Sequence, residues 1–405
     1  MKYTFKDICT KIGSGATPTG GKEAYKGGDY ALVRSQNVLD YTFTTSGLAY
    51  INETQAKKLD GVKVEAGDVL LNITGDSIAR ACIIPDEILP ARVNQHVAII
   101  RANNQYALNE YLLYFLQYNK QYLLSISQGG GTRSAITKKM IEDIEIDLPS
   151  IEYQLAIVKI INSISKKIEV NQQINDNLEQ QIQTLYREWF IDNPKTEWAT
   201  IALSEVATFV SGYSYKGNEL VDSSETAMAT IKNFERNGGF KLDGYKPVSP
   251  SLKLKEEQHA ELFDILVAHT DLTQNAEVIG NAEIILSKKS YSDVIFSMDL
   301  VKVVAKESFP YQFLLALLLK NPVFKSHCIG YVNGTTVLHM NKRALPDFNT
   351  QIPTCEDAAR MNEIAKSIFT KMSENISEIA NLTKLRDSLL PKLMSGELKI
   401  NEIDC

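Results

Sequence analysis

The sequence of 405 residues is poor in cysteine and has no long apolar run. Its five cysteines are odd in number, scattered, and never spaced as C-x-x-C, which argues against a disulfide framework and a zinc site. Apolar stretches such as residues 313–319 are far too short to span a bilayer. Residues 1–7 contain no apolar signal core. These absences predict a cytoplasmic protein.

Catalytic motifs are also missing. No P-loop of the form G-x-x-x-x-G-K-[ST] occurs, and the five histidines show no metal-ligand spacing. Residues 321–324, Asn-Pro-Val-Phe, come nearest to the motif of amino-methyltransferases. They lack its second proline, and no F-x-G-x-G loop precedes them, so we interpret them as a helix-terminating turn. The sequence therefore predicts a chain that is not an enzyme and holds no metal or cofactor.

An excess of positive charge is missing as well. The net charge is −6: residues 1–149 are neutral, and residues 150–197, 198–353 and 354–405 each carry −2. Because phosphate neutralisation dominates non-specific affinity for nucleic acids, composition alone does not identify a nucleic-acid binder. A protein of this charge would have to bind through local patches or with a partner's help.

The most regular feature of the sequence is a long helical pattern over residues 151–190. No proline or glycine interrupts it, and Ser150 before it can cap a helix. Alternating steps of three and four residues form the seam of a coiled coil: Ile157, Ile161, Ile164, Ile168, Asn171, Asn175, Leu178, Ile182, Leu185 and Trp189. We expect the two asparagines in this seam to be structural and to fix the register of the pair.

The second half of the chain repeats the order of the first. Residues 202–206 correspond to 4–8, and a helix over 311–319 corresponds to one over 109–124. A second long helix is predicted over residues 355–390, ending at Pro391. Its seam is less regular: Met361, Ile364, Ile368, Met372, Asn375, Ile379, Leu382, Leu385 and Leu389. The pattern indicates a tandem duplication of a globular half followed by a long helix.

We therefore predict an α+β fold with two mixed α/β domains related by a pseudo-twofold axis. Two long helices separate them and form an antiparallel coiled coil, because an isolated helix could not bury its seam. The predicted parts are residues 1–149, 150–192, 197–353 and 354–394, with a tail over 395–405.

Several motifs match a known family in order along the chain. They lie at residues 12–18, 33–38, 67–75, 93–98, 128–133, 136–137 and 148–154 in the first half, and at 211–216 and 389–398 in the second. With them the chain resembles the DNA-specificity subunits of type I restriction–modification systems over essentially its full length. The second half departs from the pattern, because residues 333–336 lack the first half's triple glycine and no stretch matches the Asn-Gln-His of residues 94–96.

The resemblance implies a non-catalytic subunit with two target recognition domains, each reading one part of a split target in double-stranded DNA. The long helices would set the spacing and dock two modification subunits, which methylate adenine with S-adenosylmethionine. Restriction subunits, which combine motor and nuclease, would join for cleavage. The alternative is a stand-alone or relic scaffold that uses its coiled coil in another assembly.

Candidate DNA-binding residues follow from side-chain chemistry, since Arg pairs with guanine, and Asn or Gln with adenine, in the major groove. The glycines at 129–131 let backbone amides approach phosphates, although a flexible turn explains them equally well. We expect residues 94–96 to hydrogen-bond their own loop instead of reading bases. The candidates are Ser14, Thr17, Arg34, Ser35, Gln36, Asn37, Arg92, Arg133, Lys138, Lys139, Tyr213, Tyr215, Lys216, Lys232, Asn233, Thr273, Gln274, Asn275, Lys342 and Arg343.

Overall fold

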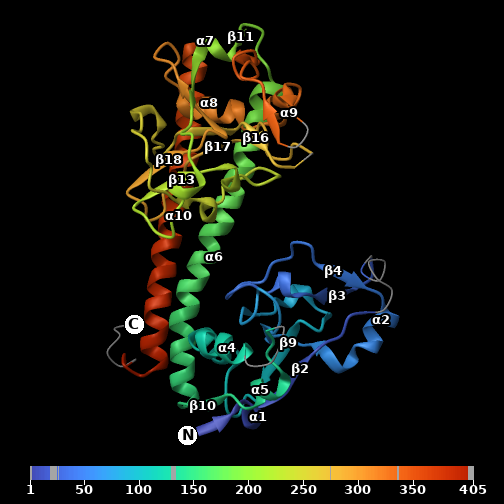
Figure 1. Ribbon diagram of the computed structural model, residues 1–405. Helices are drawn as coiled ribbons and strands as arrows, with labels where there is room; N and C mark the ends of the chain where they lie inside the picture. The colour runs from blue at the N-terminus through green and yellow to red at the C-terminus, as the bar shows by residue number, and fades with distance from the viewer. Residues whose placement is uncertain are drawn as a thin grey trace. The chain divides into compact units, whose positions relative to one another are not determined.

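The computed structural model describes residues 2–18, 25, 27–128, 134–273, 275–334 and 337–399. The chain divides into two compact units, coloured along the sequence in Figure 1. Unit 1 combines Met1–Lys167 with Leu382–Cys405, and unit 2 is Ile168–Asn381. Each unit therefore contains one predicted globular part together with portions of both long helices.

Unit 1 is built on two four-stranded sheets. The first has the order β2-β9-β6-β7, with β2 at Cys9–Ser14, β9 at Val97–Ala102, β6 at Val69–Asn72 and β7 at Ala81–Ile83. The second has the order β4-β3-β8-β5, with β4 at Ala49–Ile51, β3 at Tyr30–Val33, β8 at Ala91–Val93 and β5 at Lys63–Val64. A separate pair joins β1 (Lys2–Thr4) to β10 (Glu145–Asp147). Short helices of this unit include α1 (Phe5–Ile8), α2 (Glu53–Lys58) and α5 (Lys138–Glu142).

The first sheet is buried on both faces, which explains its continuous apolar runs. Leu70 packs into the core between the two sheets, whereas Val69 and Leu71 pack into a core that also contains Ile157 of the long helix. Successive side chains of a strand point to opposite faces, so one apolar run serves two cores.

Unit 2 repeats this arrangement. Its main sheet has the order β12-β19-β15-β17, with β12 at Ala207–Ser211, β19 at Leu300–Ala305, β15 at Ile265–Ala268 and β17 at Ala282–Ile284. Strand β13 (Thr226–Ala229) pairs in parallel with β18 (Asp293–Phe296), as β3 does with β8. Strands β11 (Ala199–Ala202) and β22 (Asn349–Ile352) form a separate pair. Further elements of this unit include α7 (Leu203–Val206), β14 (Lys246–Pro247), β16 (Thr270–Asp271), β20 (Val332–Asn333) and β21 (Leu338–Met340). The matching strand orders confirm the predicted duplication.

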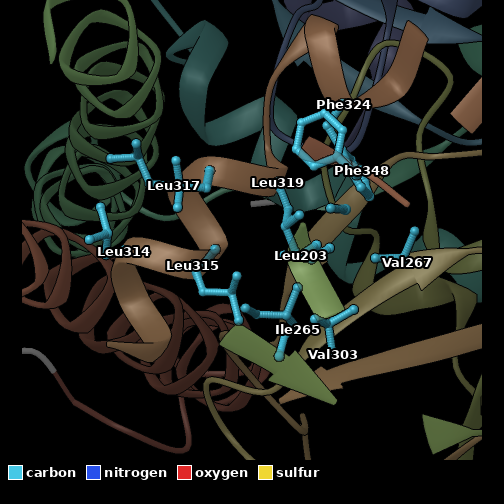
Figure 2. Packing of buried hydrophobic residues seen from close by; sticks show 14 of the residues in the cluster. Leu203, Ile265, Val267, Val303, Leu314, Leu315, Leu317, Leu319, Phe324 and Phe348 are labelled. Atoms are coloured by element: carbon cyan, nitrogen blue, oxygen red, sulfur yellow. The ribbon is translucent and has the colours of Figure 1, made fainter. Parts of the chain in front are cut away.

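A pair of short helices covers the main sheet of each unit: α3 (Asn109–Tyr118) and α4 (Lys120–Ser127), then α8 (Gln312–Leu319) and α9 (Pro322–Ile329). Figure 2 shows Leu315 of α8 lying against Ile265 and Val303 of the sheet. The prediction of one helix over 109–124 is wrong, because the chain leaves helical geometry at Asn119, whose side-chain amide bonds the Phe115 carbonyl at 2.9 Å.

Residues 321–324 form a turn, as predicted, but the turn starts a helix as well as ending one. The Asn321 side-chain oxygen accepts hydrogen bonds from the amides of Val323 and Phe324, at 2.8 and 3.0 Å. Pro322 stands at the first helical position, where no amide donor is needed.

The long helices are α6 (Ile151–Arg187), which continues into a π-helical turn over Glu188–Asp192, and α10 (Cys355–Met394). They run antiparallel. In unit 2 Asn175 bonds Asn375, and in unit 1 the Tyr153 hydroxyl bonds the Leu398 carbonyl at 3.5 Å. The predicted seam of α6 is buried or half-buried throughout.

Two details of α10 correct the prediction. The helix does not end at Pro391, which removes a single amide donor, but continues to Met394. Its seam also differs, because Ile364 and Leu385 are 38% and 45% exposed whereas Ala365 and Phe369 are fully buried.

A polar layer interrupts the apolar seam in unit 2. Asn375 donates to the Asn175 side-chain oxygen at 2.8 Å, and Asn175 donates to the Met372 carbonyl at 3.3 Å. One turn earlier in α6, Asn171 donates to Glu378 at 2.8 Å. These bonds confirm that both predicted asparagines are structural, and only the observed register satisfies them.

Each long helix also positions a short one. The Gln154 side chain of α6 accepts a hydrogen bond from the Leu108 amide, just before α3, at 3.1 Å. In unit 2 the Asn362 side chain of α10 accepts from the Phe313 amide at 3.0 Å. These side chains satisfy amide donors at a helix start, which has no partner within its own helix.

Candidate nucleic-acid interface

Four segments of unit 1 meet at one end of the two sheets. The Gly15 amide bonds the Asn94 carbonyl at 3.1 Å, and the Ile73 amide bonds the His96 carbonyl at 3.0 Å. The Ile136 amide in turn bonds the Ile73 carbonyl at 2.9 Å. Segments distant in sequence, one of which carries the predicted DNA-binding residues Ser14 and Thr17, thus form one surface region that we call strand end 1 (residues 14–17, 73–75, 94–96 and 134–137).

Side chains within strand end 1 bond one another. The Thr74 hydroxyl lies 2.5 Å from Nδ1 of His96, and the Thr17 hydroxyl donates to the side-chain oxygen of Gln95. The Asn94 side chain accepts from the His96 amide at 3.0 Å. These contacts confirm the prediction that residues 94–96 hydrogen-bond their own loop.

Unit 2 has an equivalent region, strand end 2 (residues 211–215, 269–273, 297–299 and 338–342). The Met298 amide bonds the Tyr213 carbonyl at 2.9 Å, and the His269 amide bonds the Asp299 carbonyl at 2.8 Å. The Thr270 hydroxyl donates to Asp299 at 3.0 Å, as Thr74 contacts His96 in unit 1. Residues 297–299 are therefore the counterpart of 94–96 that the sequence comparison missed.

One glycine in each region is required by a close approach of the backbone. A Cβ atom on Gly15 would lie 1.6 Å from the Val93 carbonyl oxygen, and one on Gly212 would lie 2.1 Å from that of Ser297. Both distances are below any van der Waals contact, so only glycine fits. These paired glycines are the sequence signal that could have located the missing counterpart.

A 3-10 turn follows the first parallel strand in each unit, at Ser35–Asn37 and Ile231–Asn233. The side-chain oxygens of Asn37 and Asn233 accept from the backbone amides at Arg34 and Thr230, at 3.1 and 2.9 Å. Their amide groups donate to carbonyls further along the same loops. The two asparagines, both fully buried, hold equivalent loops in shape.

The structure places the predicted DNA-binding residues in three environments. Exposed side chains are Ser14, Thr17, Gln36, Lys138, Lys139, Lys216, Lys232, Asn275, Lys342 and Arg343. Half-buried side chains are Arg34, Ser35, Tyr215 and Thr273, and buried ones are Asn37, Arg92, Tyr213 and Asn233. Arg133 and Gln274 lie outside the described residues.

Two of the buried candidates are occupied by contacts inside their own unit. Arg92 pairs with Asp60 at 2.6 Å and donates to the Ala56 carbonyl at 3.1 Å. The Tyr213 hydroxyl donates to Glu219 at 3.0 Å and accepts from the Leu252 amide at 3.2 Å. These interactions hold each side chain within its unit.

Comparison with known proteins places the chain. A family model described as the type I restriction modification DNA specificity domain matches residues 1–180. The HindI type I restriction enzyme specificity subunit of Haemophilus influenzae is 25% identical, and the alignment covers 91% of this chain and 94% of that protein. The MjaIX specificity subunit of Methanocaldococcus jannaschii is 24% identical, with 98% and 93% covered. Residues 1–180 belong to the type I restriction–modification DNA-specificity family, and over most of its length the chain is similar to specificity subunits of such systems.

A solved structure has the same fold as this chain. The type I restriction–modification S subunit from M. genitalium superposes with a TM-score of 0.59 at 12% identity, covering 97% of this chain and 95% of that one. The likeness agrees with the predicted α+β architecture of paired domains and long helices.

Three basic side chains directly beside the two strand ends pair with acidic residues. Lys138 and Lys139 pair with acidic residues one turn later, at 3.5 and 2.5 Å, and Arg343 pairs with Asp347 at 3.9 Å. Burial lowers the pKa of His269, and the nearby His339 and Lys342 lower it further. The His269 imidazole is therefore neutral near pH 7 and can accept as well as donate a hydrogen bond.

The described part of the chain lacks two kinds of feature, a metal site and a membrane-spanning helix. Among those residues, no group of three His, Cys, Asp or Glu side chains is arranged to hold a metal ion. No helix within the described ranges has the length and apolar character that a membrane span requires.

A carboxylate ties the Tyr213 segment of strand end 2 together. Glu219 accepts hydrogen bonds from the Ser251 hydroxyl and amide, the Lys216 amide and the Tyr213 hydroxyl. These donors, led by the Ser251 hydroxyl, lower the pKa of Glu219 from 4.5 to about 2. Glu219 is the last residue of a short 3-10 turn, and its bond from the Lys216 amide holds the start of that turn in place.

We expect the Glu219→Gln variant to lose part of the pH dependence of unit 2 stability. A folded pKa below the unfolded value contributes stability above pH 4.5, and that contribution disappears as pH falls from 4.5 toward 2. The free energy of unfolding of the variant and of the wild type is measured with denaturant between pH 2.5 and 6. The difference between the two should be largest at pH 6. The exposed-site variant Glu256→Gln is the control, and an equal slope in both variants would contradict the assignment.

Proposed function

We propose that this chain is the DNA-recognition subunit of a type I restriction–modification complex and reads a split target in double-stranded DNA. The recognition domains are residues 1–149 and 197–353, one for each half-site. The observation that carries the proposal is the duplicated strand end. Two regions with the same backbone bonding present different exposed side chains, which suits two readers built on one scaffold.

The long helices α6 and α10 act as the spacer between the two readers in this proposal. Each passes from one unit into the other, and the polar layer fixes their register. A fixed register suits a spacer, because a slip of one helix turn would change the distance that it sets by about 5 Å. Outward-facing polar residues of the same helices are the surface on which two modification subunits dock.

The chemistry belongs to the partners. The modification subunits methylate adenine with S-adenosylmethionine, and the restriction subunits cleave DNA. This chain selects the site. Its near-neutral charge supports the division, since the partners then supply the phosphate contacts that give affinity.

The test is to express the chain with its cognate modification subunits and to map methyladenine across host DNA. We expect one split motif with a fixed gap. Replacing residues 1–149 with the equivalent part of another family member should change one half of the motif and leave the other half and the gap unchanged. A motif that changes in both halves, or in neither, would contradict the two-reader proposal. Absence of methylation would favour a scaffold role in another assembly.

A further inference from the structure

A short hairpin follows the 3-10 turn of unit 2 and continues the segment that carries Lys232. Phe234 bridges Phe240, and the Glu235 amide bonds the Gly239 carbonyl at 3.0 Å. Gly238 and Gly239 at its tip have φ values of 89° and 115°, which glycine adopts without strain. This hairpin, residues 234–240, directly follows the turn that carries Lys232.

The hairpin is held by buried side chains of unit 2. The Gly239 amide donates to Oε1 of Glu283 at 2.6 Å, and the Asn281 side chain donates to the Glu235 carbonyl at 2.7 Å. Glu283 lies in β17 and its side chain is only 4% exposed. A buried carboxylate that accepts a backbone amide holds that amide in a narrow range of positions.

The same carboxylate is linked to the long helix. Its second oxygen pairs with the Lys320 ammonium, and Lys320 pairs with Glu179 of α6 at 3.2 Å. The Lys320 side chain is 11% exposed and that of Glu179 is 31% exposed. A continuous series of charge-assisted contacts thus joins Gly239, Glu283, Lys320 and Glu179.

Unit 1 connects its corresponding loop to a short helix and to a long helix through different residues. Gln117 stands eight residues after Asn109, as Lys320 stands eight after Gln312, and both helix-start side chains accept from the end of the preceding strand. Gln117 donates to Asp40, in the loop after the 3-10 turn of unit 1, at 3.2 Å.

The loop of unit 1 also reaches a long helix. Tyr41, next to Asp40, lies under the guanidinium of Arg386 in α10, 3.8 Å from its ring centre. A charged group that close to an aromatic face is attracted to it. In each unit, therefore, the loop that follows the 3-10 turn is fixed on a long helix.

We propose that Glu283, Lys320 and Glu179 are positioning residues for recognition of the second half-site, and that Tyr41 and Arg386 serve the first. They fix each loop after the 3-10 turn against the helical spacer, and so set the angle at which the turn's side chains meet the bases. This inference rests on the proposed function, because it assigns a role within target recognition.

The test uses the complete complex of the chain with its modification subunits, and three variants. Glu283→Gln and Glu179→Gln interrupt the series in unit 2, and Arg386→Met interrupts the contact in unit 1. Methylation is measured on the cognate duplex and on duplexes with single base changes in either half-site. Glu256→Gln is the control, and thermal unfolding of each variant shows that it is folded at the assay temperature.

We expect discrimination at the second half-site to fall by roughly tenfold in the two glutamate variants, as for one misplaced base contact, with the first half-site unchanged. Arg386→Met should lower discrimination at the first half-site by a similar factor and leave the second half-site unchanged. Equal loss at both half-sites, or none in folded variants, would overturn the proposal. Failure of the proposed function is distinguishable, because the wild-type complex would then show no split motif.

Discussion

Replacing Lys320 with methionine should lower the free energy of unfolding of unit 2 by about 3–5 kcal/mol, the cost of removing one partner from a buried ion pair. Burial lowers the pKa of Lys320, but Glu283 and Glu179 outweigh that effect, so its pKa lies above the ordinary value and the ammonium is charged at neutral pH. The variant leaves the nearly buried Glu283 carboxylate without its cation.

The measurement can be confined to this unit. The chain has two tryptophans, Trp189 and Trp198, and both belong to unit 2. Their fluorescence during denaturation therefore reports unit 2 unfolding. Lys288→Met is the matched control, since its partner Glu261 is 66% exposed and such pairs contribute less than about 1 kcal/mol. Equal stability of the two variants would disprove a buried, energetically coupled network.

Lengthening both long helices by one heptad should widen the gap between the half-sites by about three base pairs. Seven residues add about 10.5 Å of helix at 1.5 Å per residue, and base pairs are spaced about 3.4 Å apart. Duplicating residues 168–174 in α6 and 376–382 in α10 keeps the seam in phase and retains the Asn175–Asn375 bond. The half-site sequences should not change.

Methyladenine mapping of the lengthened chain with its modification subunits gives the gap directly. Duplicating the heptad in α6 alone is the control, because unequal helices cannot satisfy both the polar layer and the remaining seam, and methylation should be lost. An unchanged gap in the double duplication would show that the helices do not set the spacing.

Periodicity within one helix was predictable from the sequence, whereas pairings between distant segments were less so. The seam of α6 follows from local spacing alone, and its two structural asparagines were identified by their place in that seam. The exposed Ile364 and buried Ala365 show the limit, because the neighbours of α10 in unit 2 decide which of two adjacent residues is covered. Residue type alone predicted that Ile364, and not Ala365, would be the covered residue.

In the candidate interface, too, local motifs were predictable from the sequence, whereas contacts between distant segments were not. Motif order located all four segments of strand end 1, but the match between His96 and Asp299 could not be found from residue type, since one is basic and the other acidic. Their common feature is a contact with Thr74 and Thr270, which depends on strand register. Arg92 was chosen for its chemistry, and its ion pair with Asp60 joins residues 32 positions apart.

The division of the chain into units has a consequence for the order of folding during synthesis. Unit 2 is one continuous segment, so all of its core residues have been made once Asn381 has been added. The core of unit 1 includes Leu390 and Leu393 beside Ile157 and Ile161. Closing it brings together residues more than 200 positions apart. The half of the protein that leaves the ribosome first is therefore the half that completes its core last.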